Sequence, residues 1–405
     1  MATNKEQNKL NVPHLRFPEF HGEWEEHGLS EYLDFKNGLN PDSKRFGKGI
    51  KFISVMDILN NPVITYDCIR ASVQATDAEM SSFSVENGDI LFQRSSETLE
   101  DVGRANVYID DKVAVFGGFV IRGKKKANYN PLFFRYLLSS PYARKRIIPM
   151  GAGAQHFNIG QEGLSKVLLN FPSIEEQTKI ASLLHLLDER IATQSKLIEK
   201  LESLIKGINQ RVFMNSGNNY KLGEICEIRS GYSGSQLLSK KGLKVSRIET
   251  ISGHKVNMER VGYVAPFESS ENYRLRVGDI LFSNINSVEY IGNTAFIDKD
   301  YDLYHGMNLL RLTPNHMVVI PFYLYLLLNT NRMLNRFKAV CNKAVSQASI
   351  NQTELGKTVV QIPPINTQEQ ICELYQALYT KLETESHTKS LFQNQKQYML
   401  RQMFI

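Results

Sequence analysis

Three short motifs in this 405-residue chain contain residue types that catalyse reactions on nucleic acids. Asn130–Phe133 loosely matches the Asn-Pro-Pro-Tyr/Phe motif with which amino-methylases grip an adenine, but the second proline is missing. Phe46–Gly49 is similar to a glycine loop for a methyl donor, yet no apolar strand leads into it. Pro41-Asp42 and Asp110–Lys112 contain the carboxylates and lysine of a nuclease site, but they lie too far apart. We interpret all three motifs as turns.

Stronger catalytic and metal-binding signatures are absent from the sequence. It has no Gly-x-x-x-x-Gly-Lys-Ser/Thr phosphate loop, no His-Glu-x-x-His zinc motif and no Gly-x-Ser-x-Gly nucleophile elbow. The four cysteines are widely separated, and the nine histidines show no ligand spacing, so neither a metal site nor a disulfide framework is indicated. We therefore expect a chain that is not itself an enzyme and that holds no cofactor.

A second group of polar side chains suits hydrogen bonding to the edges of bases. These residues follow the pentapeptide Gly-Asp-Ile-Leu-Phe, which occurs at Gly88–Phe92 and again at Gly278–Phe282, and recur in a later loop of each copy. Arginine pairs with guanine, asparagine and glutamine pair with adenine, and serine pairs with either. The candidates are Gln93, Arg94, Ser95, Gln155, His156 and Asn158 in the first copy, and Ser283, Asn284, Asn286, Lys343, Ser346, Gln347, Ser349 and Asn351 in the second.

Cations near these loops could hold phosphates. They are Lys36, Lys44, Arg45 and Lys48 in the first copy, and Arg229, Lys240, Lys241 and Lys244 in the second. The net charge of +6 permits a nucleic-acid partner without requiring one. Each residue alone could equally be a solvated loop side chain. Because polar loops recur at equivalent places in both copies, the whole set favours double-stranded DNA as the partner.

The elements that position these loops are themselves repeated. The pentapeptides are 190 residues apart (278 − 88), and Pro131–Leu138 matches Pro321–Leu328 at the same shift. A period of this length predicts two homologous globular domains. In the first domain, the apolar patterns predict short strands and one amphipathic helix. The predicted strands are Leu29–Phe35, Ile50–Ile58, Ile90–Phe92, Ala105–Ile109, Val113–Ile121 and Val167–Phe171, and the predicted helix is Leu132–Ile147.

A long helix is predicted to follow each domain, because apolar residues recur at alternating four- and three-residue spacing. The first seam is interrupted by Gln194, and the second has Glu385 and Lys389 at seam positions. Each seam covers roughly 50 Å of helix. The seam residues are Ile180, Leu184, Leu187, Ile191, Ile198, Leu201, Ile205, Ile208 and Val212, and then Ile371, Tyr375, Leu378, Leu382, Phe392, Met399 and Met403.

These patterns predict an α+β protein with a pseudo-twofold internal repeat. Two homologous mixed α/β domains are separated by two long antiparallel helices that form an intramolecular coiled coil. An ordinary helix packed on its own domain is the alternative for each seam. The predicted segments are a disordered tail (1–14), the first domain (15–172), its helix (173–214), a linker (215–219), the second domain (220–363) and its helix (364–405).

Taken together, these motifs and repeats resemble those of the DNA-specificity subunit of Type I restriction–modification systems. The resemblance rests on Leu15–Phe20, the two pentapeptides, Phe171–Gln177 leading into Ile180–Leu184, and Leu187–Ile191. It covers essentially the whole chain after the tail. One departure is Asn366–Gln370, where the family usually has a Glu-Glu-Gln helix start.

The resemblance implies two target-recognition domains, each of which reads half of a bipartite, asymmetric DNA site. The helices would set the unread gap and dock two modification subunits, which methylate adenine with S-adenosylmethionine. Two restriction subunits would translocate and cleave DNA with ATP and Mg²⁺. Without the resemblance, the alternative is a coiled-coil scaffold whose two domains bind proteins. The start of the chain has no apolar segment typical of a signal peptide, and no stretch is long enough to span a membrane, so we expect a cytoplasmic protein.

Overall fold

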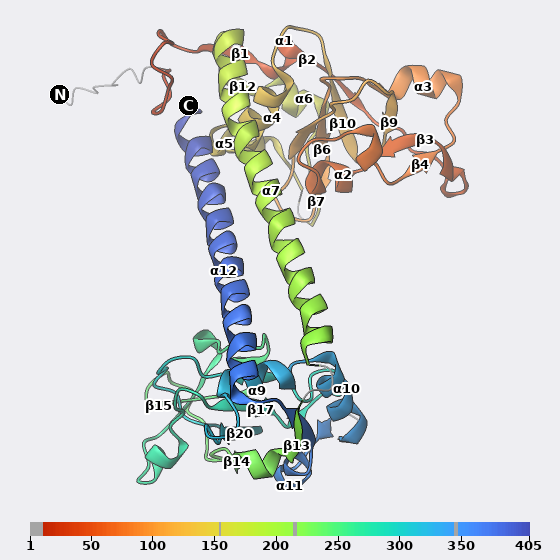
Figure 1. Cartoon of the computed structure of the whole chain (residues 1–405). Helices are drawn as coiled ribbons and strands as arrows, with labels where there is room; N and C mark the ends of the chain where they lie inside the picture. The colour runs from red at the N-terminus through yellow and green to blue at the C-terminus, as the bar shows by residue number, and fades with distance from the viewer. Residues whose placement is uncertain (1–10, 154, 214–216, 344–346) are drawn as a thin grey trace, which may run out of the picture. The chain divides into compact units, whose positions relative to one another are not determined.

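The computed structural model describes residues 11–153, 155–213, 217–343 and 347–405. The chain divides into two compact units. Unit 1 contains the chain up to Lys196 together with Ser386–Ile405, and unit 2 contains Leu197–Glu385. Each unit therefore holds one mixed α/β domain and a part of each long helix (Figure 1).

Unit 1 is built on a four-stranded antiparallel sheet with the order β2-β10-β6-β8. A second sheet, β4-β3-β9-β5, contains one parallel pair, β3 with β9. Two short ribbons, β1-β12 and β7-β11, complete the unit. The strands are β1 (Glu25–Gly28), β2 (Leu33–Asn37), β3 (Phe46–Ile53), β4 (Ser72–Val73), β5 (Ser84–Val85), β6 (Ile90–Gln93), β7 (Ser95–Ser96), β8 (Ala105–Val107), β9 (Ala114–Phe116), β10 (Val120–Lys125), β11 (Phe157–Asn158) and β12 (Leu168–Phe171).

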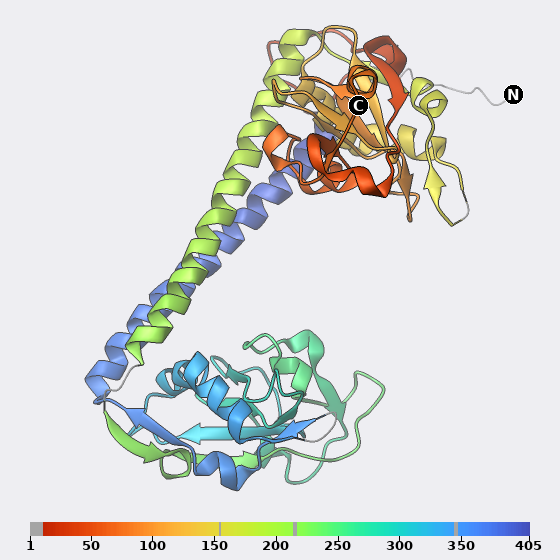
Figure 2. The ribbon, with the colours of Figure 1, turned by 90° about the vertical axis from the view of Figure 1, so that its right-hand side faces the viewer.

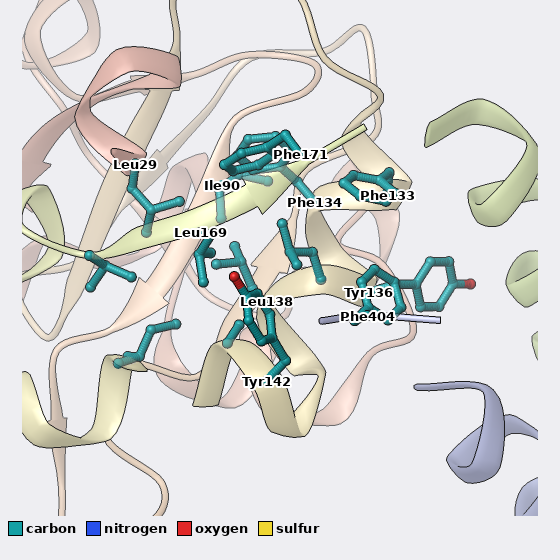
Figure 3. Packing of buried hydrophobic residues seen from close by; sticks show 14 of the residues in the cluster. Leu29, Ile90, Phe133, Phe134, Tyr136, Leu138, Tyr142, Leu169, Phe171 and Phe404 are labelled. Carbon is teal, nitrogen blue, oxygen red and sulfur yellow. The ribbon is translucent and has the colours of Figure 1, made fainter. Parts of the chain in front are cut away.

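The core of unit 1 lies between the first sheet and the short helices α4 and α5. Aromatic residues of α4, including Phe133, Phe134 and Tyr136, are buried there (Figure 3). The rings of Phe134 and Tyr129 stack 4.0 Å apart. Phe404, from the end of the chain, packs on Phe133 with ring centroids 5.6 Å apart. The helices are α1 (Leu29–Tyr32), α2 (Val55–Asn60), α3 (Asp77–Phe83), α4 (Pro131–Ser139), α5 (Pro141–Ile147) and α6 (Gln161–Ser165).

Unit 2 repeats the central sheet of unit 1 in the order β14-β20-β17-β19, with two ribbons, β13-β23 and β15-β16, and a three-stranded sheet, β18-β22-β21. Its strands are β13 (Asn218–Lys221), β14 (Cys226–Ser230), β15 (Leu243–Val245), β16 (Gly262–Val264), β17 (Ile280–Ser283), β18 (Ile285–Asn286), β19 (Thr294–Phe296), β20 (Leu309–Pro314), β21 (Asn342–Lys343), β22 (Ala348–Ser349) and β23 (Val359–Ile362). Its helices are α8 (Leu222–Ile225), α9 (Pro321–Leu328), α10 (Asn331–Val340) and α11 (Gln352–Gly356). The equivalent strand order confirms the internal repeat.

The repeat extends to close backbone contacts. In unit 1 a bridge joins Leu39 to Gly117, and in unit 2 a bridge joins Tyr232 to Gly306. A side chain on Gly38 would strike the carbonyl of Gly117, and one on Gly231 would strike the carbonyl of Gly306. The two domains therefore share a backbone framework that requires glycine at the same place.

The long helices α7 (Ile174–Val212) and α12 (Ile365–Gln402) pack against each other within both units. In unit 1, Lys396 of α12 pairs with Asp188 of α7, and in unit 2 the Tyr375 hydroxyl of α12 hydrogen-bonds Asn209 of α7. The two contacts occur in opposite order along the helices, which confirms that the helices are antiparallel. Figures 1 and 2 show them side by side in each unit. All the predicted seam residues are buried or half-buried.

Several predicted boundaries are wrong. Leu29–Tyr32 is helical rather than extended, Val55–Asn60 is a helix rather than the end of a strand, and Val113–Ile121 is divided between β9 and β10. The predicted helix Leu132–Ile147 is two helices, separated at Ser140.

The ends of the first domain and the linker also differ from the prediction. Trp24 N–H donates to Asn11 O (2.8 Å), so residues 11–14 are part of unit 1 rather than of a disordered tail. Asn218 and Asn219, predicted in the linker, belong to β13. Residues 1–10 and 214–216 lie outside the described residues.

Candidate nucleic-acid interface

In unit 1, the fold brings the two predicted reading segments together. β7, which follows the pentapeptide, pairs with β11 of the glycine-rich loop. Ile159 N–H donates to Arg94 O (2.9 Å), and the Ser95 hydroxyl donates to Asn158 Oδ1. Gln155, His156 and Asn158 are exposed on this paired edge. Two segments about 60 residues apart in the sequence therefore present their polar side chains on the same edge of unit 1.

Unit 2 repeats this arrangement with different side chains. β18 pairs with β22 of the later loop, and Ile350 N–H donates to Asn284 O (2.9 Å), as Ile159 does to Arg94 in unit 1. Asn286 and Ser349 are half-buried, and Gln347 is exposed. Ser346 and the side chain of Lys343 lie outside the described residues. The framework is common to both units, whereas the side chains that it presents differ.

Three predicted base contacts have structural roles instead. Gln93 is 5% exposed, and its Nε2 donates to Ser95 O (2.9 Å). Ser283 is fully buried, and its hydroxyl accepts from Asn286 Nδ2 (3.1 Å). Asn351 caps α11, since its Oδ1 accepts from Glu354 N–H (2.8 Å). Gln93 and Ser283 cannot reach a base from these positions, so they support the reading edge rather than form it.

The predicted phosphate-binding cations divide into two groups. Arg45 pairs with Glu79 and holds the pKa of that carboxyl at about 2, Arg229 pairs with Glu227, and Lys36 donates to Ser82 Oγ (2.6 Å). These three are used inside their own domains. The others are Lys44, Lys48, Lys240 and Lys241, which are exposed, and Lys244, which is half-buried; within the described parts of the chain they form no ion pair.

Two further features of unit 1 were not identified from the sequence. The first is a group of exposed apolar side chains beside the reading edge of unit 1, including Phe119 and Met56. The sequence did offer one sign of this group: Phe119 directly follows Gly117 and Gly118, a pair at which a turn is expected. The second is a polar cluster at the junction of helices and domain in unit 1.

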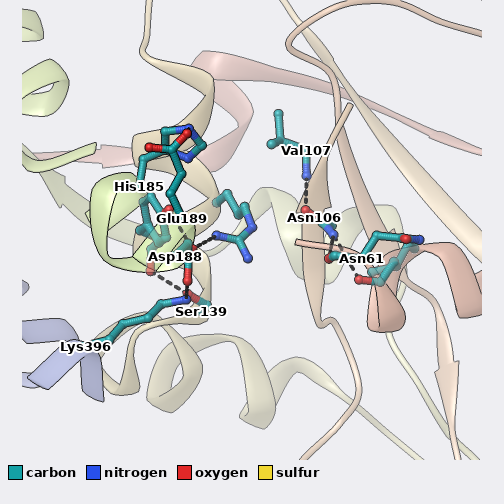
Figure 4. Close-up of polar contacts among 11 residues, drawn as sticks. Asn61, Asn106, Val107, Ser139, His185, Asp188, Glu189 and Lys396 are labelled. Carbon is teal, nitrogen blue, oxygen red and sulfur yellow. Dashed lines mark hydrogen bonds and ion pairs between the residues drawn. The ribbon is translucent and has the colours of Figure 1, made fainter. Parts of the chain in front are cut away.

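That cluster is centred on Asp188 of α7 (Figure 4). Its carboxylate accepts from the Tyr136 hydroxyl (2.8 Å) and from Arg135 Nη1 (3.2 Å), and it pairs with Lys396 of α12. Burial alone would raise the pKa of Asp188, but these partners outweigh burial and lower it. Asp188 therefore stays charged and fixes both long helices to α4.

Comparisons with known proteins give similar results at the level of the whole chain. The family described as "Type I restriction modification DNA specificity domain" matches twice, over residues 21–203 and 216–391. The putative type I restriction enzyme MjaX specificity subunit of Methanocaldococcus jannaschii is 38% identical over 188 residues, which are 45% of this chain and 44% of that protein. The chain thus matches less than half the length of this relative.

Two further comparisons cover more of the chain. The type I restriction enzyme EcoKI specificity subunit of Escherichia coli is 25% identical over 325 residues, or 73% of this chain and 68% of that protein. The crystal structure of the S subunit from M. genitalium superposes with a TM-score of 0.60 at 16% identity and covers 97% of this chain and 99% of that one. This structural likeness concerns the fold alone.

The described residues show neither a metal site nor a membrane span. None of their His, Cys, Asp and Glu side chains gather in groups of three or more that could hold a metal ion. In the same part of the chain, no helix has the length and apolar character needed to cross a bilayer.

Proposed function

Because the chain belongs to the Type I restriction modification DNA specificity family, we propose that each unit reads one half of a bipartite, asymmetric DNA site. The observation that carries this proposal is the repeated pairing of β7 with β11 and of β18 with β22. In each unit this pairing joins two polar loops on one framework, with side chains that differ between the units. Different side chains on a common framework suit an asymmetric site.

The proposed base-reading residues are the exposed and half-buried members of the predicted set, apart from Asn351, which caps α11. In unit 1 they are Arg94, Ser95, Gln155, His156 and Asn158, and in unit 2 they are Asn284, Asn286, Gln347 and Ser349. The exposed lysines Lys44, Lys48, Lys240 and Lys241 contact phosphates and fix the register of each domain on the duplex.

The helices set the spacing between the two half-sites. α7 has 39 residues and α12 has 38, which corresponds to roughly 57 Å of helix at 1.5 Å per residue. Half-sites read from one face of DNA are about 34 Å apart for each helical turn. Helices of this length can therefore serve two half-sites with unread bases between them.

Catalysis belongs to partner subunits. Two modification subunits dock on the helices and methylate adenine with S-adenosylmethionine, and two restriction subunits translocate and cleave DNA with ATP and Mg²⁺. The chain itself supplies DNA recognition and no catalytic group. A scaffold that binds proteins through its two domains is the competing function.

Selection of bound duplexes from a random pool tests the proposal. The full chain, assembled with its modification subunits, should enrich duplexes with two fixed blocks separated by a constant number of unconstrained bases. Replacing Gln155, His156 and Asn158 with alanine should relax one block only, and replacing Asn286, Gln347 and Ser349 should relax the other. Each lost bidentate contact should cost about 1–3 kcal/mol of binding free energy. Under the scaffold alternative, no fixed block is enriched and neither triple variant changes DNA binding.

A further inference from the structure

An exposed apolar patch lies beside the reading edge of unit 1. Its members are Phe46, Met56 and Phe119, which are 42%, 61% and 69% exposed, and they line one cavity of about 410 Å³. They come from β3, from α2 and from the turn that leads into β10 (Figure 1). Single exposed apolar residues are common, but a group that lines one cavity indicates a binding surface.

The apolar patch and the polar reading residues are directly adjacent. Arg94 N–H donates to Phe119 O (2.9 Å), and Arg94 Nη1 donates to Gly118 O (3.2 Å). Ser95, which donates to Asn158, also lines the cavity. A ligand that touches Arg94 and Asn158 therefore lies within reach of Phe119.

The charges around the patch favour DNA as this ligand. Lys44 and Lys48 lie on either side of Phe46 in sequence, are exposed, and form no ion pair with any described residue. An apolar patch with hydrogen-bonding side chains at its edge, and with two exposed lysines close in sequence to Phe46, complements a groove lined with phosphates. The apolar group on the base edges of the major groove is the 5-methyl group of thymine.

We propose that Phe119, together with Phe46 and Met56, receives the 5-methyl group of a thymine in the half-site read by unit 1. This inference rests on the proposed function, and it adds an apolar specificity contact to the polar ones. Phe119 is fixed for this role by its backbone bond to Arg94. The thymine lies next to the base that Arg94 contacts.

Unit 2 has no equivalent aromatic residue. Phe119 is two residues after Gly117, and the corresponding glycine of unit 2, Gly306, is followed two residues later by Asn308. Asn308 has a positive φ of 64° and a polar side chain. The half-site read by unit 2 therefore provides an internal control on the same DNA molecule.

Replacement of thymine by uracil, which removes only the methyl group, tests the contact. The full complex is titrated with its selected duplex, with a duplex carrying uracil in the first half-site, and with one carrying uracil in the second. Uracil in the first half-site should weaken binding of the unaltered protein roughly three- to fivefold. Phe119→Ala should bind the selected duplex more weakly by a similar factor and should not discriminate uracil from thymine there. Phe119→Leu, which keeps an apolar contact, should still discriminate.

The outcomes separate this inference from the proposed function. If the unaltered protein binds its selected duplex specifically but ignores uracil in the first half-site, the methyl contact is refuted and DNA recognition stands. The methyl contact is likewise refuted if Phe119→Ala discriminates as strongly as the unaltered protein, or if the first half-site contains no thymine. If no duplex is selected at all, the proposed function itself fails. Uracil in the second half-site should not change the ratio of the affinities of the Phe119→Ala and unaltered proteins.

Discussion

Asp188 of α7 and Lys396 of α12 form an ion pair although 208 residues separate them in the chain. Both side chains are largely buried, with 18% and 17% exposure, and the same carboxylate also accepts from Arg135 and Tyr136 of α4. One acidic residue thus joins two long helices and a domain helix within unit 1. Lys396 occupies a position that continues the apolar seam. Its buried charge is tolerated there because it pairs with Asp188.

Asp188→Asn should destabilise unit 1 by about 2 kcal/mol, because it leaves Lys396 and Arg135 without their shared carboxylate. Trp24, the only tryptophan, packs 6.4 Å from Phe404 at the end of the chain, so its fluorescence during urea denaturation reports on this region. Glu189→Gln, which alters the exposed neighbour, is the control. In a double-mutant cycle with Lys396→Met, the coupling free energy should be at least about 0.5 kcal/mol. Strictly additive effects would rule out the role given to the pair.

A matched pair of leucines on α7 tests the burial of the helix seam. Leu184 is fully buried, whereas Leu186 is 57% exposed. Leu184→Ala should lower the free energy of unfolding by about 3 kcal/mol, since it opens a cavity in the core of unit 1. Leu186→Ala should change it by less than about 0.5 kcal/mol. Equal effects, measured by the same urea denaturation, would show that the seam faces another way.

Unit 2 should lose stability in mild acid because of His305. Burial lowers the pKa of this histidine to about 4, while its Nε2 lies 2.9 Å from Leu309 O. The unfolded chain has the ordinary value near 6.5. The stabilisation is therefore complete above pH 6.5 and declines as the pH falls towards 4, with a loss of about 2 kcal/mol at pH 5. Hydrogen exchange of unit 2 amides at about pH 7.5 and pH 5 measures the loss, and a variant with His305→Gln should show a smaller difference.

The exposed lysines of unit 1 should control the salt dependence of DNA binding. Replacing Lys44 and Lys48 with glutamine should reduce the slope of log K against log salt concentration by roughly 2, because each phosphate contact contributes about 0.9. Lys166→Gln is the control, since Lys166 is exposed but pairs with Glu162 of α6. An unchanged slope in the double variant would place these lysines outside the interface.

Much of the fold could be predicted from the sequence because the strongest signals are periodic or repeated. The seams of α7 and α12 extend over many turns, and the duplicated pentapeptide marks β6 and β17 in equivalent sheets. Short apolar runs were less informative. Leu29–Tyr32 became a helix because Glu31 accepts from Gly28 N–H (2.7 Å) at the helix start, a local bond that outweighs the β-like composition.

The break after α4 has a comparable local cause. Ser140 caps α5, with its hydroxyl accepting from Ala143 N–H (3.2 Å), and Pro141 occupies the first helical position. A proline disfavours a helical conformation in the preceding residue, so one continuous helix was not possible. The Ser140-Pro141 pair was a visible sign of this break, but the amphipathic pattern that continues across it suggested one helix.

The candidate site was predictable in location but not in detail. Both reading segments could be found because they follow repeated motifs. The side chains that face outward could not be predicted. Gln93 and Ser283, for example, lie at the ends of strands, and their burial depends on packing against distant segments. Polar chemistry alone also could not identify Phe119, because its exposure depends on the turn between β9 and β10.

The most direct test of DNA specificity is single-molecule sequencing of genomic DNA from a host that expresses this chain with its modification subunit. We predict a bipartite motif that carries N6-methyladenine, is absent when the chain is omitted, and changes in one half only when Gln155, His156 and Asn158 are replaced. If the complex assembles stably and no new methylated motif appears, the chain does not determine DNA specificity.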